Sequence, residues 1–288
     1  MEIKLTSVKV DLLKDFLGKL VNFDKNVFIK ISPEITTSNV YFPNKDAVKI
    51  VEESTDSLFS FSQPLTEDIK VAFYNAKDIM TALNFFSGSD NVEGRIECVE
   101  DKSSHGLTAE SFLLKNKDEK FKLFCLDPNF SFIDMTDDEI VSTFATDDLN
   151  TEADSDQVYF ANFEVNFDMI KKIESRLKLK KDEAKFTIKI IDKKAYIVTK
   201  NNELLVSEDV TVVSDKLDSV TLFKKYLSLL DRENYTIHLC SSKVIFASDV
   251  SDTKLAISSS LVDEDLDTME DLNTVEEAFD DLDDLQLN

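Results

Sequence analysis

Residues 10–31 decide the fold: VDLLKDFLGKLV (10–21) is followed, after a short connection, by VFIKI (27–31). The apolar residues of the first segment recur at helical spacing, so a helix would carry them on one face. They are Leu12, Leu13, Phe16, Leu17 and Leu20. In the second segment, apolar residues alternate as they do in a half-buried strand. The sequence therefore predicts a one-sided helix that lies on a sheet.

The same plan recurs along the chain. Helical periodicity is found at residues 7–21, 75–86, 164–180 and 219–230, and period-two segments follow each of these stretches. The inward positions expected in the strands are Val27/Ile29/Ile31, Ile69/Val71/Phe73, Val92/Ile96/Cys98, Phe121/Leu123/Cys125, Phe186/Ile188/Ile190, Tyr196/Val198, Ile237/Leu239, Val244/Phe246 and Leu255/Ile257. We predict an α+β protein of two similar domains, each with two helices packed on antiparallel sheets.

Composition and charge predict the boundaries between these domains. Residues 134–156 include TDDEIVST and TDDLNTEADSD, which are acidic and poor in core-type periodicity, so we expect a connector there. Residues 263–288 hold twelve acidic residues and no lysine or arginine, which predicts a mobile acidic tail. The expected domains are residues 1–133 and 157–262. Apolar residues recur every three or four positions in the tail, so it could also fold as a helix on a partner.

Size and hydropathy favour a soluble intracellular protein. A chain of 288 residues with 42% hydrophobic content can bury the cores of two domains. No apolar run approaches the ~20 residues needed to cross a bilayer, and the first residues, MEIKLTSVKV, lack a secretion signal.

Chemical motifs are scarce. The four glycines form neither GxxxxGK[ST] nor GxGxxG, so no phosphate-cradling loop is predicted. The cysteines Cys98, Cys125 and Cys240 lie far apart in strand-like segments, and we expect buried thiols. The two histidines, His105 and His238, have no good metal ligand nearby. We expect no metal, no cofactor and no catalytic site.

The duplicated plan resembles that of DNA polymerase sliding clamps of the bacteriophage type, which are PCNA-like processivity factors. The similarity lies in the opening helix VDLLKDFLGKLV with FIKI, in AKDIMTALNFFSGSDNVEGRIECVED, and in the closing strands KVIFASDVSDTKLAISSS. It covers about residues 1–262 and rests on patterning rather than on a diagnostic motif. The resemblance implies a ring of three two-domain subunits that encircles duplex DNA and catalyses nothing.

Charge segregation fits this resemblance. The chain has a net charge of −24, yet residues 7–21, 75–87, 165–180 and 218–231 together hold eleven basic and seven acidic residues. In a clamp these helices would face the DNA, whose phosphates attract lysine and arginine. The same lysines would equally serve as the polar outer face of any amphipathic helix, and the acidic remainder of the chain favours the DNA interpretation. The predicted DNA-contacting residues are Lys14, Lys19, Lys77, Lys171, Lys172, Arg176, Lys178, Lys224 and Lys225.

The resemblance also implies partners: duplex DNA bound without sequence preference, a DNA polymerase, a clamp-loader ATPase and two further copies of the chain. A peptide-binding pocket near the connector is implied as well, although the sequence does not assign its residues. No membrane association is expected, and the location would be cytoplasmic, in the host cell if the protein is viral.

Two other hypotheses remain open. The acidic end, EEAFDDLDDLQLN, resembles the C-termini with which single-stranded DNA-binding proteins recruit partners. Such proteins need exposed aromatic platforms, whereas most of the 22 phenylalanines here fall on the apolar phase of predicted helices and strands. A replication or transcription adaptor with a clamp-like fold but no ring is the third hypothesis.

Overall fold

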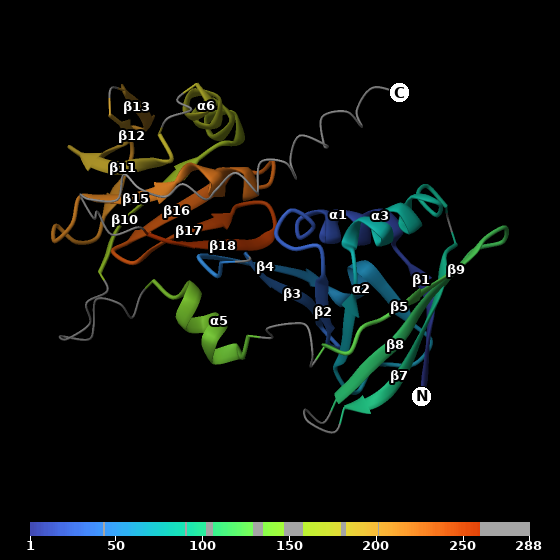
Figure 1. The fold of residues 1–288 in the computed structure, drawn as a ribbon. Helices are drawn as coiled ribbons and strands as arrows, with labels where there is room; N and C mark the ends of the chain where they lie inside the picture. The colour runs from blue at the N-terminus through green and yellow to red at the C-terminus, as the bar shows by residue number, and fades with distance from the viewer. Residues whose placement is uncertain are drawn as a thin grey trace.

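The computed structural model describes residues 1–42, 44–89, 91–101, 106–128, 135–146, 158–179, 183–200 and 202–259. His105 and the predicted tail at 263–288 lie outside these residues, as do residues 134 and 147–156 of the predicted connector. The chain forms two halves side by side, each combining helices with antiparallel strands (Figure 1).

The first half begins with a strand and then the helix predicted from the opening sequence. Its elements are β1 (Glu2–Val8), α1 (Val10–Gly18), β2 (Val27–Ile31), β3 (Ile35–Tyr41), β4 (Ala47–Ser54), α2 (Thr55–Leu58), β5 (Phe59–Phe61), β6 (Ile69–Phe73), α3 (Ala76–Asn84), β7 (Glu93–Asp101), β8 (Gly106–Lys115) and β9 (Lys120–Phe124).

After helix α5 (Asp137–Phe144), the second half repeats this order, except that its described residues have no helix between β13 and β14 to match α2. Its elements are β10 (Tyr159–Val165), α6 (Phe167–Lys178), β11 (Lys185–Ile191), β12 (Lys194–Thr199), β13 (Asn202–Ser207), β14 (Thr211–Val212), β15 (Ser219–Phe223), the 3-10 helix η2 (Lys224–Leu229), β16 (Tyr235–Cys240), β17 (Lys243–Ser248) and β18 (Asp252–Ser258).

The strand order shows the duplication directly. In the first half, β4-β3-β2-β6 form one run and β5-β1-β7-β8-β9 another. The second half has the same two runs, β13-β12-β11-β15 and β14-β10-β16-β17-β18. Each strand of one half therefore has a counterpart in the other, and the predicted fold class, α+β with two similar helix-and-sheet units, is confirmed.

One strand pair joins the two halves. Strand β18, the last of the second half, pairs antiparallel with β4 of the first half, from Asp252 opposite Glu52 to Ile257 opposite Ala47. A single sheet therefore runs through the junction, and the cores of both halves belong to one continuous apolar cluster.

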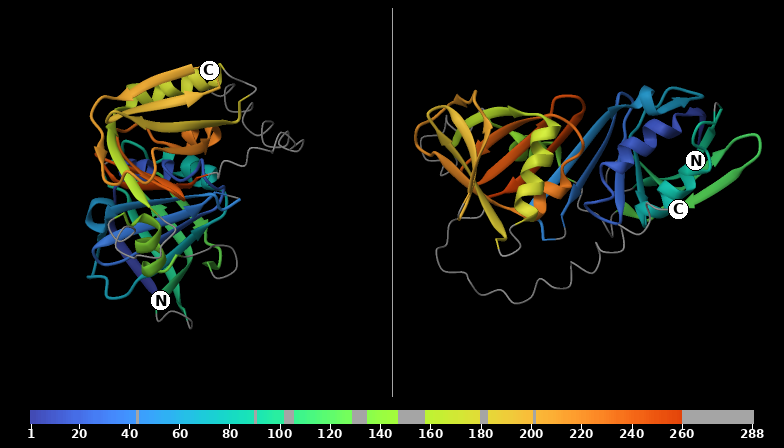
Figure 2. Two further views of the ribbon diagram at one scale, coloured as in Figure 1. Left: turned by 90° about the vertical axis from the view of Figure 1, so that its left-hand side faces the viewer. Right: turned by 90° about the horizontal axis from the view of Figure 1, so that it is seen from above.

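The helices bury the faces that their sequences predict. Helix α1 buries Val10, Leu13, Phe16 and Leu17, and α6 buries Ile170, Ile173 and Leu177. Asn166 caps the start of α6, where its side chain accepts a hydrogen bond of 2.9 Å from the backbone N–H of Met169. Helices α1, α3 and α6 lie on the upper side of the molecule in Figure 1 and face the viewer in the right-hand view of Figure 2, whereas α5 lies on the lower side.

The prediction of a fourth helix, over residues 219–230, is wrong. Residues 219–223 form strand β15, which pairs with β11, and only 224–229 are helical, in the tighter 3-10 form. The apolar spacing of Leu222, Phe223, Tyr226 and Leu227 fits either structure, but SVTLF also alternates with period two, and pairing along β11 decides in favour of the strand.

Smaller corrections concern which side chains face the core. In β12, Ala195 and Ile197 are buried, whereas the predicted inward pair Tyr196 and Val198 is only half-buried. Leu12, assigned to the apolar face of the first helix, is 49% exposed.

The predicted connector is partly helical, since α5 begins at a capping box formed by Thr136 and Glu139. None of the helices in the described ranges has the length and hydropathy needed to cross a lipid bilayer.

Candidate nucleic-acid interface

Helix α6 presents the densest set of predicted contact residues. Because Ile170, Ile173 and Leu177 anchor its buried side, the cations between them point to solvent. Within the described part of the chain, no carboxylate lies within ion-pair distance of these cations, which leaves them available to an anionic ligand. They are Lys171, Lys172, Arg176 and Lys178, all exposed.

The lysines of α1 and α3 lie closer to acidic residues than the cations of α6 do. Lys77 on α3 is exposed and stands next to Asp78. Lys14 on α1 is half-buried, and its Nζ donates to Ser87 Oγ at 3.4 Å. Ser87 in turn donates to Asp11 at 2.5 Å, which lowers the pKa of Asp11, so the carboxylate stays charged beside Lys14. These contacts link α1 to the turn that follows α3 and offset the charge of Lys14.

Lys19 does not share the solvent-facing position predicted for it. Its side chain is 19% exposed, and Nζ lies 3.0 Å from Glu233 Oε1 and 3.3 Å from Thr253 Oγ1. Both partners belong to the second half of the chain. We therefore assign Lys19 to the junction between the halves, and its charge is satisfied there.

The two lysines of η2 lie beside α6, against which η2 packs. Lys224 is half-buried and Lys225 is exposed. The Lys225 ammonium lies 4.9 Å from the ring centre of Tyr226 and 5.5 Å from those of Phe42 and Phe223. Cation–π attraction to three rings fixes the position of this side chain without neutralising its charge. The hydroxyl of Tyr226 donates to the Asp46 carboxylate, which adds a further bond between the halves.

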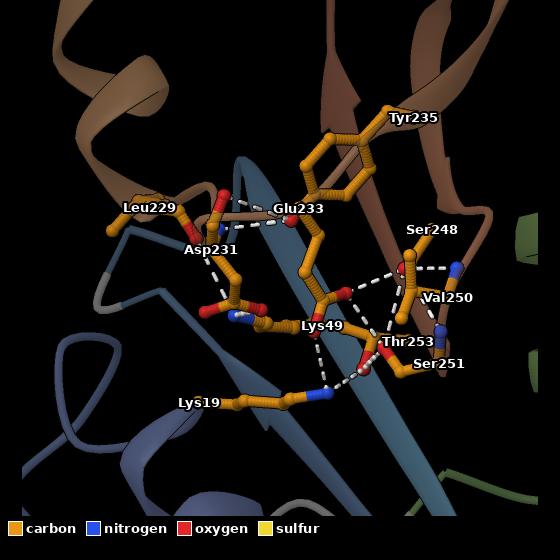
Figure 3. A network of polar contacts seen from close by, with 10 residues as sticks. All are labelled: Lys19, Lys49, Leu229, Asp231, Glu233, Tyr235, Ser248, Val250, Ser251 and Thr253. Atoms are coloured by element: carbon orange, nitrogen blue, oxygen red, sulfur yellow. Dashed lines mark hydrogen bonds and ion pairs between the residues drawn. The ribbon is translucent and has the colours of Figure 1, made fainter. Parts of the chain in front are cut away.

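A buried ion-pair network holds the junction (Figure 3). Lys49 on β4 is 2% exposed in its side chain, and its Nζ lies 2.7 Å from Asp231 Oδ2 and 3.4 Å from the carbonyl oxygen of Leu229. The Lys49 ammonium also lies 5.5 Å from the centre of the Phe23 ring. Burial of a charge is costly unless it is paired, so these contacts keep Lys49 in place.

Glu233 forms the second part of the network. It pairs with Lys19 and accepts a hydrogen bond of 2.7 Å from Ser251, and Ser248 donates to it as well. Burial alone would raise the pKa of Glu233, but these hydrogen bonds and the Lys19 ammonium together lower it. At Asp231, burial outweighs the attraction of Lys49 and raises the pKa. Asp231 and Glu233 therefore each form an ion pair with a lysine of the first half.

Arg232, between these two carboxylates, is a cation that the sequence analysis missed. Its side chain is exposed and lines a hollow on the side of the molecule where α1 lies, together with Lys14 and Asp15. In the sequence, Asp231 and Glu233 flank Arg232, so its positive charge is expected to be offset by these neighbours. Only the fold shows that both neighbours turn toward lysines of the first half.

The prediction of buried thiols is mostly confirmed. Cys98 and Cys240 are buried, Cys125 is half-buried, and all three are free thiols. His238 lies on β16 with its ring near Tyr159, whose hydroxyl is 3.1 Å from Nδ1. Among the described residues, no three His, Cys, Asp or Glu side chains gather in a way that could hold a metal ion.

Several strands of the described structure pair on one side only, among them β9 and β13 as well as β5, β14 and β15. β9 pairs only with β8, and β13 only with β12. Exposed apolar side chains lie at both edges: Phe124 on β9 is 78% exposed, and Leu179, at the end of α6 near β13, is 81% exposed. A groove lined by Ile173, Leu177, Ile197 and Leu204 runs between α6 and the β12–β13 hairpin.

On the opposite side, α5 covers a small apolar cluster at the junction. Ile140 and Phe144 of this helix pack against Val48 of the first half and Ile245 and Ala256 of the second. The ammonium of Lys243 donates to the carbonyl oxygens of Ser142 at 3.0 Å and Thr143 at 2.6 Å, which satisfies the end of the helix. Helix α5 belongs to the predicted connector, near which the resemblance implies a peptide pocket.

Comparison with known proteins supports the fold. No protein-family model matches the sequence, and no curated protein matches it. Among solved structures, the chain is similar to PCNA from Thermococcus kodakaraensis, with a TM-score of 0.56 over 90% of this chain and 99% of that one. The two sequences are 14% identical, so the likeness is one of fold. The chain has a PCNA-like clamp fold.

Proposed function

We propose that this chain is the subunit of a sliding clamp, a ring that encircles duplex DNA and tethers a DNA polymerase to it. The observation that carries the proposal is the duplicated strand plan. The pair β18–β4 closes the junction within the chain, and the duplication makes β9 the counterpart of β18 and β13 the counterpart of β4. The open edges β9 and β13 are therefore the two strands that should pair between neighbouring copies.

Such pairing is head-to-tail, because each copy uses one edge at each end, and head-to-tail contacts form a closed ring when the rotation closes. Three two-domain subunits would place six similar units around the ring. The exposed Phe124 of one copy would come close to Leu179 and to the apolar groove beside β13 of the next, which would remove apolar side chains from water.

The DNA would pass along the side that carries α1, α3, α6 and η2. Contacts between lysines and phosphates position a protein on DNA but carry no sequence information, so a ring held by such contacts can slide. The role proposed is binding and tethering, with no catalytic step. A clamp-loader ATPase would open the ring, and the polymerase would dock on the outer side, near α5. The bacteriophage-type assignment and the cytoplasmic location are parts of the same proposal.

Two measurements test this function. The mass in solution should be that of three chains of 32.7 kDa, about 98 kDa. After loading by the cognate loader or by transient opening of the ring, the protein should stay on circular duplex and be lost from the same duplex once it is made linear. A monomer that binds single strands tightly, in proportion to their length, would refute the clamp and favour the single-stranded DNA-binding hypothesis.

A further inference from the structure

We propose that the second half of each subunit supplies the surface that contacts DNA phosphates, while the first half lines the channel with little net charge. This inference rests on the clamp function proposed above. Helices α1 and α3 of the first half correspond to α6 and η2 of the second half in the duplicated fold, and we propose different roles for these two pairs.

The first-half pair carries almost no excess of positive charge. Helix α1 has one lysine, Lys14, and two aspartates, Asp11 and Asp15, whereas α3 has one lysine and one aspartate. Lys14 is tied to Ser87, and Asp11 shares that serine. Lys19, just beyond α1, is neutralised by Glu233. A phosphate approaching this surface would meet carboxylates as often as free ammonium groups.

The second-half pair is strongly cationic by comparison. Helix α6 has four cations against Asp168 and Glu174, and η2 has two lysines and no acidic residue. Arg232 lies apart from this set, in a hollow that it shares with Lys14, Asp15 and Glu53 of the first half. Lys225 is held in place by its aromatic neighbours. The cations of α6 and η2 are exposed or half-buried, and η2 packs against α6.

The two surfaces would act separately in solution. At physiological ionic strength the Debye length is about 8 Å, so charges farther apart than this are largely screened from each other. The net charge of −24 therefore does not cancel the local field of α6 and η2. A ring of such subunits would offer alternating cationic and near-neutral sectors, and DNA would be attracted to the cationic sectors.

Charge-matched double variants test this division. Each contact to a phosphate of B-DNA contributes about 0.9 to the slope of log K against log[salt]. We expect Lys171→Gln/Lys172→Gln to reduce the slope measured with a short linear duplex by about 1–2, and Lys14→Gln/Lys77→Gln to leave it unchanged. Fluorescence anisotropy over a salt series gives these slopes.

Solution mass is the control, since all variants should keep the mass of the wild-type assembly. If the first-half variant reduces the slope as much as the α6 variant does, the division between the halves is wrong while the clamp remains. If the wild type is a monomer with no salt-dependent binding to duplex, both this inference and the clamp function fail.

Discussion

At the residue scale, Lys49 shows that the contacts between the two halves cannot be predicted from local sequence. It sits in AVKIVEES, where a lysine between apolar residues reads as an ordinary surface position of a strand. Its partner Asp231 is 182 positions away in the chain, and no local pattern connects the two. Arg232 and Lys19 were misjudged for the same reason, since their charge balance depends on contacts between the halves.

Removing Lys49 should strongly destabilise the fold. Lys49→Ala leaves the half-buried Asp231 without its cation. Breaking a fully buried ion pair from one side costs about 3–5 kcal/mol in the free energy of unfolding, so we expect a loss near the lower end of this range. Lys49→Met/Asp231→Leu, which removes both charges and keeps apolar volume, should recover most of that loss. Urea denaturation measures each value.

The matched control for this pair is Lys4→Ala, because Lys4 has a 71% exposed side chain at 4.0 Å from Glu2. It should change stability by less than about 0.5 kcal/mol. An equal effect of Lys4→Ala and Lys49→Ala would mean that the network in Figure 3 does not stabilise the junction.

The thiols should be unreactive in the folded protein. Burial raises the pKa of Cys98 and Cys240 to about 11 and that of Cys125 to about 12, so almost no thiolate is present at neutral pH. In the unfolded chain the thiols ionise near pH ~8.5, so stability should fall as the pH rises from there toward 11. Reaction with a disulfide reagent should be slow until urea is added; a thiol that reacts rapidly in the native protein would contradict this.

At the scale of elements, strong periodicity predicted well and short or hidden elements did not. α1, α3 and α6 follow from their apolar spacing, as do β2, β6 and β16 from alternation. Strands β1, β4 and β10 were not predicted. No alternation marks β4, because it is buried on both faces along most of its length, whereas β1 and β10 directly precede helices whose periodicity is the stronger signal. The apolar spacing over β15 and η2 fits both a continuous helix and a strand followed by a short helix. Only the pairing of β15 with β11 decides for the strand.

Helix α5 should depend on very few contacts. It has eight residues, too few for a stable isolated helix in water, so its packing on the junction must hold it. Phe144→Ala and Lys243→Ala should therefore increase cleavage within 135–146 in limited proteolysis, each by several-fold. Val141→Ala, at a position 64% exposed, should not change the cleavage rate. Equal rates in all three variants would show that α5 is held by something other than these contacts.

At the scale of the whole molecule, assembly should depend on the open edges. Phe124→Asp and Leu179→Asp each place a charge where we propose that copies meet, and both positions are so exposed that the subunit itself should fold normally. Each variant should convert the assembly to monomers in analytical ultracentrifugation. Val250→Asp, at a residue 74% exposed in the loop between β17 and β18, is the control and should assemble like the wild type. Retention of the full assembly by both edge variants would exclude these edges as the interface.

The β18–β4 pairing also governs how the subunit should melt. Because one sheet and one apolar cluster pass through the junction, neither half can lose its structure without exposing the other. Calorimetry on the monomeric edge variants should therefore show a single heat-absorption peak rather than two. A gene cut between the halves should yield aggregating fragments, since the first would present β4 to water as an unprotected edge that carries an unpaired lysine.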